Sequence, residues 1–159
     1  MNLEIERKFL LSSEAWQVDA GQGRALKQTY LATTDKASVR VRIVDGAEAW
    51  LTIKSSDIGL IRSEFEYRIP VDEAMELLPL GQGEPIEKVR YPVQVGDVVW
   101  DVDVFEGANA GLVLAEIELT DEHQQLELPA WLGEEVTGKS QYYNSNLTFE
   151  PVSEWTKAP

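Results

Sequence analysis

Residues 3–9 of the chain read Leu-Glu-Ile-Glu-Arg-Lys-Phe, with a charged side chain at each of positions 4, 6 and 8. Leu3, Ile5 and Phe9 occupy most of the positions between. Successive side chains of a β-strand point to opposite faces, so this alternation predicts a strand with one charged and one apolar face. The charged face is either exposed to water or turned inward toward a ligand.

The same alternation returns along the rest of the chain, in residues 39–43, 51–54, 64–69, 88–91, 100–104 and 115–119. A further strand is expected around residues 28–31. Turn signals such as Asp45-Gly46 separate neighbouring segments and predict antiparallel hairpins. We therefore expect a mainly β (α+β) chain whose strands close, or nearly close, into a barrel, because closure removes exposed strand edges.

Helices are expected to flank this sheet. Capping residues followed by helix formers predict helices over residues 12–18, 72–78 and 121–128, and a weaker candidate spans residues 140–147. Tryptophans such as Trp50 and Trp100 are expected to pack on the outer face of the barrel. One domain is expected over residues 1–150, followed by a tail over residues 151–159.

Composition narrows the possible function. The 159 residues contain no cysteine and one histidine, which excludes a disulfide framework and a histidine-rich metal site. The net charge of −14 argues against nucleic acid or an anionic membrane as a partner. Charges begin at position 4 and no long apolar run follows, so neither a signal peptide nor a membrane span is expected. A cytoplasmic location is the resulting expectation, and the oligomeric state stays open.

The charged faces of the strands combine eight acids with seven bases. The acids are Glu4, Glu6, Glu64, Glu66, Asp101, Asp103, Glu116 and Glu118, and the bases are Lys8, Arg40, Arg42, Lys54, Arg68, Lys88 and Arg90. One interpretation is an open sheet with a solvated face. The other is a barrel whose watery lumen holds these charges. Carboxylates bind Mg²⁺ or Mn²⁺, and arginine and lysine bind phosphoryl oxygens, so the second interpretation fits a metal–polyphosphate complex.

This ordered series of charged pairs resembles the CYTH superfamily, also called triphosphate tunnel metalloenzymes. Glu4-Ile5-Glu6-Arg7-Lys8 resembles the ExExK signature of that family, and the resemblance extends to about Leu147. It implies a tunnel of eight antiparallel strands and metal-dependent chemistry on a triphosphate. One departure is Gln141, which stands before Tyr142 where relatives often carry a basic residue; Lys139 is a possible substitute.

The resemblance also implies roles for individual residues. Metal ligands for one or two Mg²⁺ or Mn²⁺ ions would be Glu4, Glu6, Asp101, Asp103, Glu116 and Glu118. Triphosphate ligands would be Lys8, Arg40, Arg42, Lys54, Lys88 and Arg90. Glu64 and Glu66 would support them by binding metal or positioning arginines. Tyr30 with Lys8 would help to activate water, although Tyr30 is as readily explained as a packing residue.

The expected activity is hydrolysis of the terminal phosphoanhydride of a linear triphosphate, with inorganic tripolyphosphate as the first choice. Three alternatives stay open. An adenylyl cyclase would need a purine pocket at the tunnel mouth, and a thiamine triphosphatase would share the same chemistry. A non-catalytic polyphosphate-binding module would bind the substrate without turnover.

Overall fold

The computed structural model describes residues 3–56 and 61–155. Its strands are β1 (Leu3–Leu11), β2 (Arg24–Thr33), β3 (Ala37–Val44), β4 (Glu48–Ser55), β5 (Ile61–Ile69), β6 (Gln82–Val95), β7 (Val98–Phe105), β8 (Val113–Glu118) and β9 (Leu132–Glu135). Its helices are α1 (Val71–Leu77) and α2 (Asn144–Leu147), with 3₁₀ turns η1 (Ala15–Asp19), η2 (Leu78–Leu80), η3 (Gly107–Asn109), η4 (Ser140–Tyr142) and η5 (Val152–Glu154).

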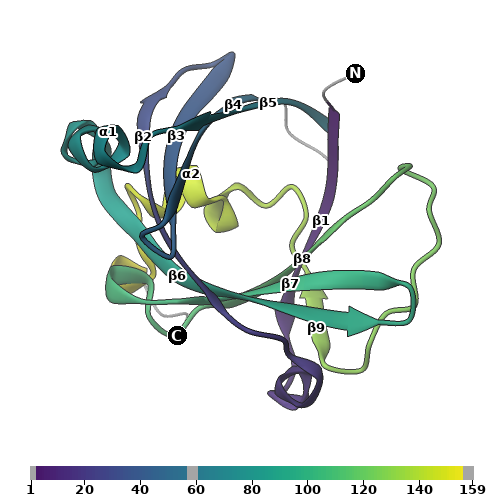
Figure 1. Cartoon of the computed structure of the whole chain (residues 1–159). Helices are drawn as coiled ribbons and strands as arrows, with labels where there is room; N and C mark the ends of the chain where they lie inside the picture. Colours follow the sequence, from purple (N-terminus) through teal and green to yellow (C-terminus); the bar gives the residue numbers. More distant parts are fainter. Residues whose placement is uncertain (1–2, 57–60, 156–159) are drawn as a thin grey trace.

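The strands form a closed antiparallel barrel. Their order is β5-β4-β3-β2-β6-β7-β8-β1, and β1 also pairs with β5, which completes the ring seen end-on in Figure 1. The predicted eight-stranded barrel is therefore confirmed. The short strand β9 pairs with the C-terminal half of β1 outside this ring, where Phe9 pairs with Glu135. The Asp45-Gly46 hairpin between β3 and β4 is also confirmed, with both residues at positive φ.

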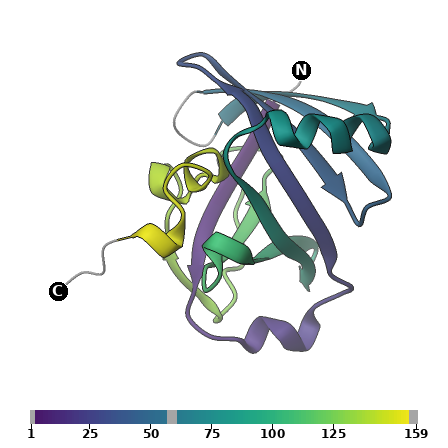
Figure 2. The ribbon, with the colours of Figure 1, turned by 90° about the vertical axis from the view of Figure 1, so that its left-hand side faces the viewer.

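The largest apolar core lies outside the barrel. It joins the outer faces of β1, β6, β7 and β8 to side chains from η1 and the segment before β9, and includes Phe9, Trp16, Trp100 and Trp131. This confirms the predicted place of Trp100, which is fully buried. A second outer cluster packs α1 across β3 and β4, as Figure 2 shows from the side. Helices, turns and connecting segments therefore cover the apolar outer faces of β1, β3, β4, β6, β7 and β8.

Trp50 departs from this expectation. It shares the face of β4 that carries Thr52 and Lys54, and the Arg68 guanidinium of β5 lies 5.9 Å from the centre of its ring. Alternation along a strand fixes this placement, because residues two apart share a face. The prediction of outer-face packing for Trp50 was therefore wrong.

A third apolar cluster closes one end of the lumen. Ile86, Phe105 and Leu114 belong to inward-facing positions of β6, β7 and β8, and Val136 and Leu147 of the C-terminal segment pack against them. Tyr142, Val152 and Trp155 pack on the same cluster. The barrel interior is thus apolar at the end that this cluster occupies and charged where the strands carry their acidic and basic residues.

Two of the four predicted helices differ clearly from expectation. The helix over residues 72–78 is confirmed as α1, and residues 140–147 contain η4 and α2. Residues 12–18 form only the 3₁₀ turn η1, in which the Ala15 amide donates to the Ser13 hydroxyl.

The helix predicted over residues 121–128 was wrong, because this segment holds a turn followed by irregular backbone. The Gln124 side-chain oxygen accepts hydrogen bonds from the Thr120 amide and hydroxyl, and Leu126 packs on the outer core. Residues 121–128 therefore cross that core without forming a helix. In the described part of the chain, no helix has the length and apolar character needed to cross a bilayer.

Candidate active site

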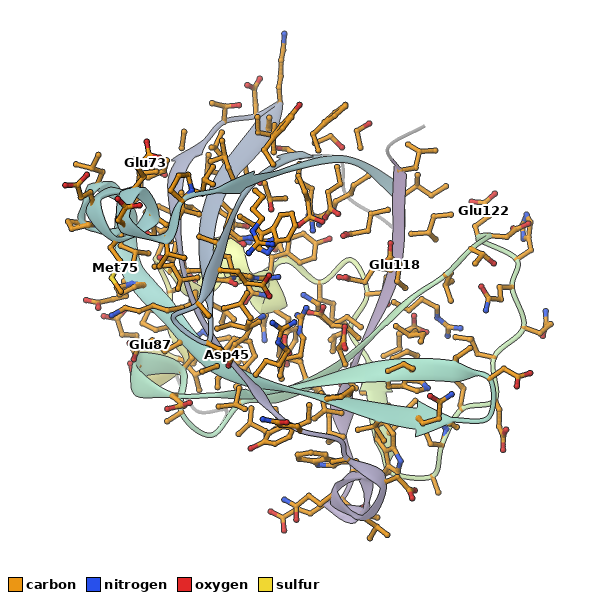
Figure 3. All side chains as sticks on the ribbon, viewed as in Figure 1. Asp45, Glu73, Met75, Glu87, Glu118 and Glu122 are labelled. Carbon is orange, nitrogen blue, oxygen red and sulfur yellow. The ribbon has the colours of Figure 1, made fainter. Side chains whose placement is uncertain are left out.

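The charged faces of the strands meet in a cavity of about 200 Å³ inside the barrel. Predicted site residues that line it are Glu4, Glu6, Lys8, Tyr30, Arg40, Arg42, Lys54, Glu64, Glu66, Lys88, Arg90, Asp101, Glu116 and Glu118. Side chains crowd this interior in Figure 3, whereas labelled residues such as Glu73 and Glu122 lie at the periphery. The alternation rule thus brings together residues from eight strands, and Asp103 lies behind the lining.

Arg40 and Arg42 form a basic wall on β3, in which the described residues leave an N–H donor without an acceptor. Arg40 is buried and donates to the Thr52 hydroxyl (3.1 Å), while its Nε has no partner among residues 3–56 and 61–155. Arg42 donates to the Gln28 side-chain oxygen (2.7 Å). Burial lowers the pKa of Arg42 to about 9, and repulsion from Arg40 and Arg90 adds to the effect. A buried guanidinium with free donors favours an anion.

Asp103 organises the basic residues of the neighbouring strand β6. Its carboxylate accepts two hydrogen bonds from Arg90 (2.7 and 2.8 Å) and pairs with Lys88 Nζ (2.7 Å). Asp103 is 0% exposed and Lys88 1%. Although burial opposes the charge, Arg90 and Lys88 lower the pKa of Asp103. Burial in turn lowers the pKa of Lys88 to about 7. Both carboxylate oxygens of this predicted metal ligand are therefore already bonded to cations.

Lys8 of β1 faces Glu116 of β8. Its Nζ lies 3.4 Å from the Glu116 carboxylate and donates to the Tyr142 carbonyl (3.3 Å). Burial works against the ammonium, yet Glu116 and Glu6 raise the pKa of Lys8. Conversely, Lys8 and Arg90 outweigh burial and hold the pKa of Glu116 well below its usual range. No hydrogen bond joins Lys8 to Tyr30 in the described part, so their predicted partnership stays a prediction.

The acidic side of the cavity carries more carboxylates than its lysines satisfy. Lys54 pairs with Glu4 (2.9 Å) and Glu64 (3.3 Å). Burial raises the pKa of Glu6 to about 7, with repulsion from Glu116 as the next cause. Burial likewise raises the pKa values of Glu4, Asp101 and Glu118, the last also through repulsion from Glu4.

This surplus is what a hard divalent cation would neutralise through oxygen ligands. Among residues 3–56 and 61–155, however, no three Asp, Glu or His side chains converge around one point. The donor chemistry of the acidic wall therefore fits a divalent metal. In this structure, Lys54 pairs with the Glu4 and Glu64 carboxylates instead.

The C-terminal segment supplies lining residues that sequence reasoning missed. The Asn144 side-chain oxygen accepts from Lys88 Nζ (3.0 Å) and Gln28 Nε2 (3.4 Å), and Tyr143 and Ser145 also line the cavity. Nothing in a short irregular segment reveals these contacts before folding. Lys139 pairs with Glu134 at the surface and does not line the cavity, so it does not replace the basic residue absent at position 141.

Arg62, Ser38 and Thr52 were also missed as lining residues. A signal was available for all three. Arg62 continues the two-residue period of Glu64 and Glu66, Ser38 continues that of Arg40, and Thr52 that of Lys54.

The chain matches proteins that carry the same fold. A family model described as "CYTH domain" matches residues 2–152. A protein of Acetivibrio thermocellus named inorganic triphosphatase is 44% identical over 152 residues, covering 95% of this chain and 96% of the relative. An inorganic triphosphatase of Nitrosomonas europaea is 39% identical over 150 residues, covering 91% and 95%.

Solved structures agree with this relationship. A crystal structure of an inorganic triphosphatase superposes with a TM-score of 0.66 at 35% identity, covering 91% of this chain and 93% of that one. A protein from Hippeastrum, described as a putative adenylyl cyclase with a dominant triphosphatase activity, shares the fold at a TM-score of 0.59 and 16% identity, covering 74% and 80%. The barrel, its charged lumen and the match over residues 2–152 show that the chain belongs to the CYTH domain family.

Proposed function

We propose that this chain is a divalent-metal-dependent hydrolase that cleaves the terminal phosphoanhydride bond of inorganic tripolyphosphate. The observation that carries the proposal is the unsatisfied basic wall, where the buried Arg40 Nε has no acceptor among the described residues and the pKa of Arg42 is lowered to about 9. A polyanion with several phosphoryl oxygens supplies the missing acceptors. The curated relatives named inorganic triphosphatase point to the same substrate.

The basic residues bind and align the substrate. Arg40, Arg42, Lys88 and Arg90 hold phosphoryl oxygens from one side, and Lys8 and Lys54 reach them from the other. Asp103 fixes Arg90 and Lys88 through the bonds described above. Holding an extended chain in this way leaves its terminal phosphorus positioned for attack by water, which converts tripolyphosphate to orthophosphate and pyrophosphate.

The acidic residues provide the oxygen ligands for Mg²⁺ or Mn²⁺. Glu4, Glu6, Glu116, Glu118 and Asp101 would hold one or two ions, supported by Glu64 and Glu66. Such an ion supplies charge neutralisation at the phosphoryl group and a more acidic water. Lys8 with Tyr30 would hold the attacking water in place and help to activate it. Tyr30→Phe tests this role, since unchanged turnover and pH profile would remove Tyr30 from the chemistry.

Phosphate release from tripolyphosphate, ATP and thiamine triphosphate tests the proposal, measured with Mg²⁺, with Mn²⁺ and with EDTA. Glu4→Gln changes the acidic wall, and Glu87→Gln is a matched control at the periphery, paired with Lys27 on the outside. We expect metal-dependent release that is fastest on tripolyphosphate, lost in Glu4→Gln and kept in Glu87→Gln.

Other products identify the competing functions. Pyrophosphate plus cyclic AMP from ATP would identify an adenylyl cyclase, and fastest release from thiamine triphosphate would identify a thiamine triphosphatase. Binding of tripolyphosphate without release under either metal would identify a non-catalytic module. Each of these results would overturn the proposed activity.

A further inference from the structure

Strand β1 changes its partner along its length. Within residues 3–56 and 61–155, it pairs with β5 over Leu3–Ile5 and Ile61–Ser63 and further along with β9. Tyr143 of the C-terminal segment lines the cavity. Arg62, the partner of Glu4 in the β1–β5 register, lines the cavity at the same place.

Tyr143 lies between two cations of the lumen. The Arg62 guanidinium carbon is 4.5 Å from the centre of its ring, and Lys8 Nζ is 5.6 Å away. The hydroxyl of Tyr143 is buried and has no hydrogen-bond partner within residues 3–56 and 61–155. A buried phenol without a partner is costly, so its hydroxyl is suited to a polar group that enters the cavity.

Arg62 has donors to offer at the same point. Its contact with the Tyr143 ring is a cation–π contact, which uses the face of the guanidinium and leaves its N–H groups in the plane. In the described part of the chain, its side chain forms no ion pair or hydrogen bond with another residue. Arg62 and the Tyr143 hydroxyl therefore present donors together beside the acidic wall.

Their position is set by the order of strands in the barrel. Counting from β5 through β4, β3 and β2 reaches β6 in four steps, and the other way through β1, β8 and β7 also takes four. Arg62 on β5 is thus on the strand opposite Lys88 and Arg90 on β6. An anion that contacts both strands must span the lumen.

We propose that Arg62 and Tyr143 bind the phosphate at one end of the substrate chain and thereby make the site selective for tripolyphosphate over pyrophosphate. This inference rests on the proposed function and assigns one of its specificity determinants. A chain held at β6 must cross the lumen to contact Arg62, so the number of its phosphates decides whether Arg62 and Tyr143 gain a partner.

The chain offers a matched control on the same strand. Arg68 shares the face of β5 with Arg62 and also lies over an aromatic ring, that of Trp50 at 5.9 Å. Its side chain is 64% exposed, it faces Glu48 at 3.7 Å, and it does not line the cavity. Arg62→Gln and Arg68→Gln therefore remove the same charge from the two ends of one strand face.

Calorimetry with tripolyphosphate and with pyrophosphate, each in EDTA, provides the test. Charge-assisted hydrogen bonds contribute enough that Arg62→Gln should weaken tripolyphosphate binding about 10- to 100-fold. Pyrophosphate binding should change less than about twofold. Tyr143→Phe keeps the ring and should weaken tripolyphosphate about 2- to 10-fold, as expected for one neutral hydrogen bond. Arg68→Gln should change neither ligand.

Four results would overturn the inference. Equal weakening of both ligands in Arg62→Gln would mean a general electrostatic effect, and equal effects of Arg62→Gln and Arg68→Gln would mean the same. Unchanged tripolyphosphate binding in Arg62→Gln, with wild-type binding and turnover intact, would remove this contact alone. Failure of the wild type itself to bind tripolyphosphate, both in EDTA and with Mg²⁺, would remove the proposed function with it. Arg62→Lys keeps the charge and is the control for unfolding. If the loss in Arg62→Gln comes from the missing charge and not from unfolding, Arg62→Lys should bind tripolyphosphate more tightly than Arg62→Gln.

Discussion

Replacing Asp103 by Asn removes the carboxylate that joins Lys88 and Arg90 while keeping the size of the side chain. The carboxylate accepts bonds of 2.7 and 2.8 Å from Arg90 and lies 2.7 Å from Lys88 Nζ. Since Asp103 is 0% exposed, water does not replace these bonds in the variant. Two buried cations would then share one neutral amide.

The expected cost follows from what each cation keeps. Breaking a buried ion pair by removing one partner costs about 3–5 kcal/mol. Arg90 keeps Glu116 at 3.4 Å and Asp101 at 3.8 Å, and Lys88 keeps the Asn144 oxygen at 3.0 Å. These contacts place the expected loss of unfolding free energy at the lower end, about 3 kcal/mol.

The loss should depend on pH in a defined direction. The pKa of Lys88 is about 7 in the wild type, and losing Asp103 lowers it further. Since an unfolded lysine has a pKa of about 10.4, the folded state gains stability with rising pH once Lys88 loses its proton. This gain begins below pH 7 in the variant and near pH 7 in the wild type. The deficit of Asp103→Asn is therefore fully present at low pH and shrinks as pH rises to about 7.

Urea unfolding of the metal-free protein at pH 5.5 and pH 8 measures both effects. A loss of about 3 kcal/mol should lower the midpoint by roughly 1.5 M at pH 5.5, and by less at pH 8. Asp101→Asn is the matched control, because this side chain on the same strand face is 43% exposed and should cost less than about 1 kcal/mol. Equal stability of Asp103→Asn and Asp101→Asn, or a deficit that grows with pH, would refute the reasoning.

Three further predictions concern the acidic wall, the basic wall and the closed end. Because the pKa of Glu6 is raised to about 7, the metal-free chain should lose stability as pH rises from about 4.5 to 7, and Mg²⁺ affinity should increase with pH up to about 7. Calorimetry in buffers of different ionisation enthalpy should detect proton release near pH 6 that Glu6→Gln abolishes, and equal release in both proteins would contradict this. Arg42→Gln relieves repulsion with Arg40, so its thermal midpoint should stay level or rise while tripolyphosphate binds at least about tenfold more weakly; a fall in the midpoint would count against the basic wall. Leu147→Ala should cost about 2–5 kcal/mol, or about 5–15 °C in the midpoint, because Leu147 is fully buried in the closed end. The half-exposed Phe149→Ala is its control, and equal losses would contradict the apolar closure.

Alternation along single strands made most of the fold and lining predictable. A period of two residues is a local property, so Glu4, Arg40 and Lys54 could be assigned to one face without knowledge of their partners. Trp50 follows the same rule, because it stands two residues before Thr52 and four before Lys54, and its assignment to the outer face departed from that rule. The rule also reaches Arg62, two residues before Glu64.

Pairing between distant segments could not be predicted. The bonds from Asp103 to Lys88 and Arg90 depend on the β6–β7 register, which aligns Arg90 with Asp103. The contact of Tyr143 with Arg62 depends on where β1 exchanges β5 for β9. Residues 121–128 carry helical capping signals but form no helix. Leu126 of this segment packs on the outer core, and such packing outweighs local propensity.

The pairing of β1 has a consequence for how the chain is made. Strand β1 is synthesised before its neighbours β5, β8 and β9, which extend to residue 135. Glu6 and Lys8 therefore find their partners Glu118 and Glu116 only when most of the barrel has been synthesised. Contacts between such distant residues slow folding, because the entropy of closing a long loop is lost before the contacts form. The strand that carries the family signature is thus among the last to be locked in place, and an incomplete chain has no assembled acidic wall with which to sequester metal.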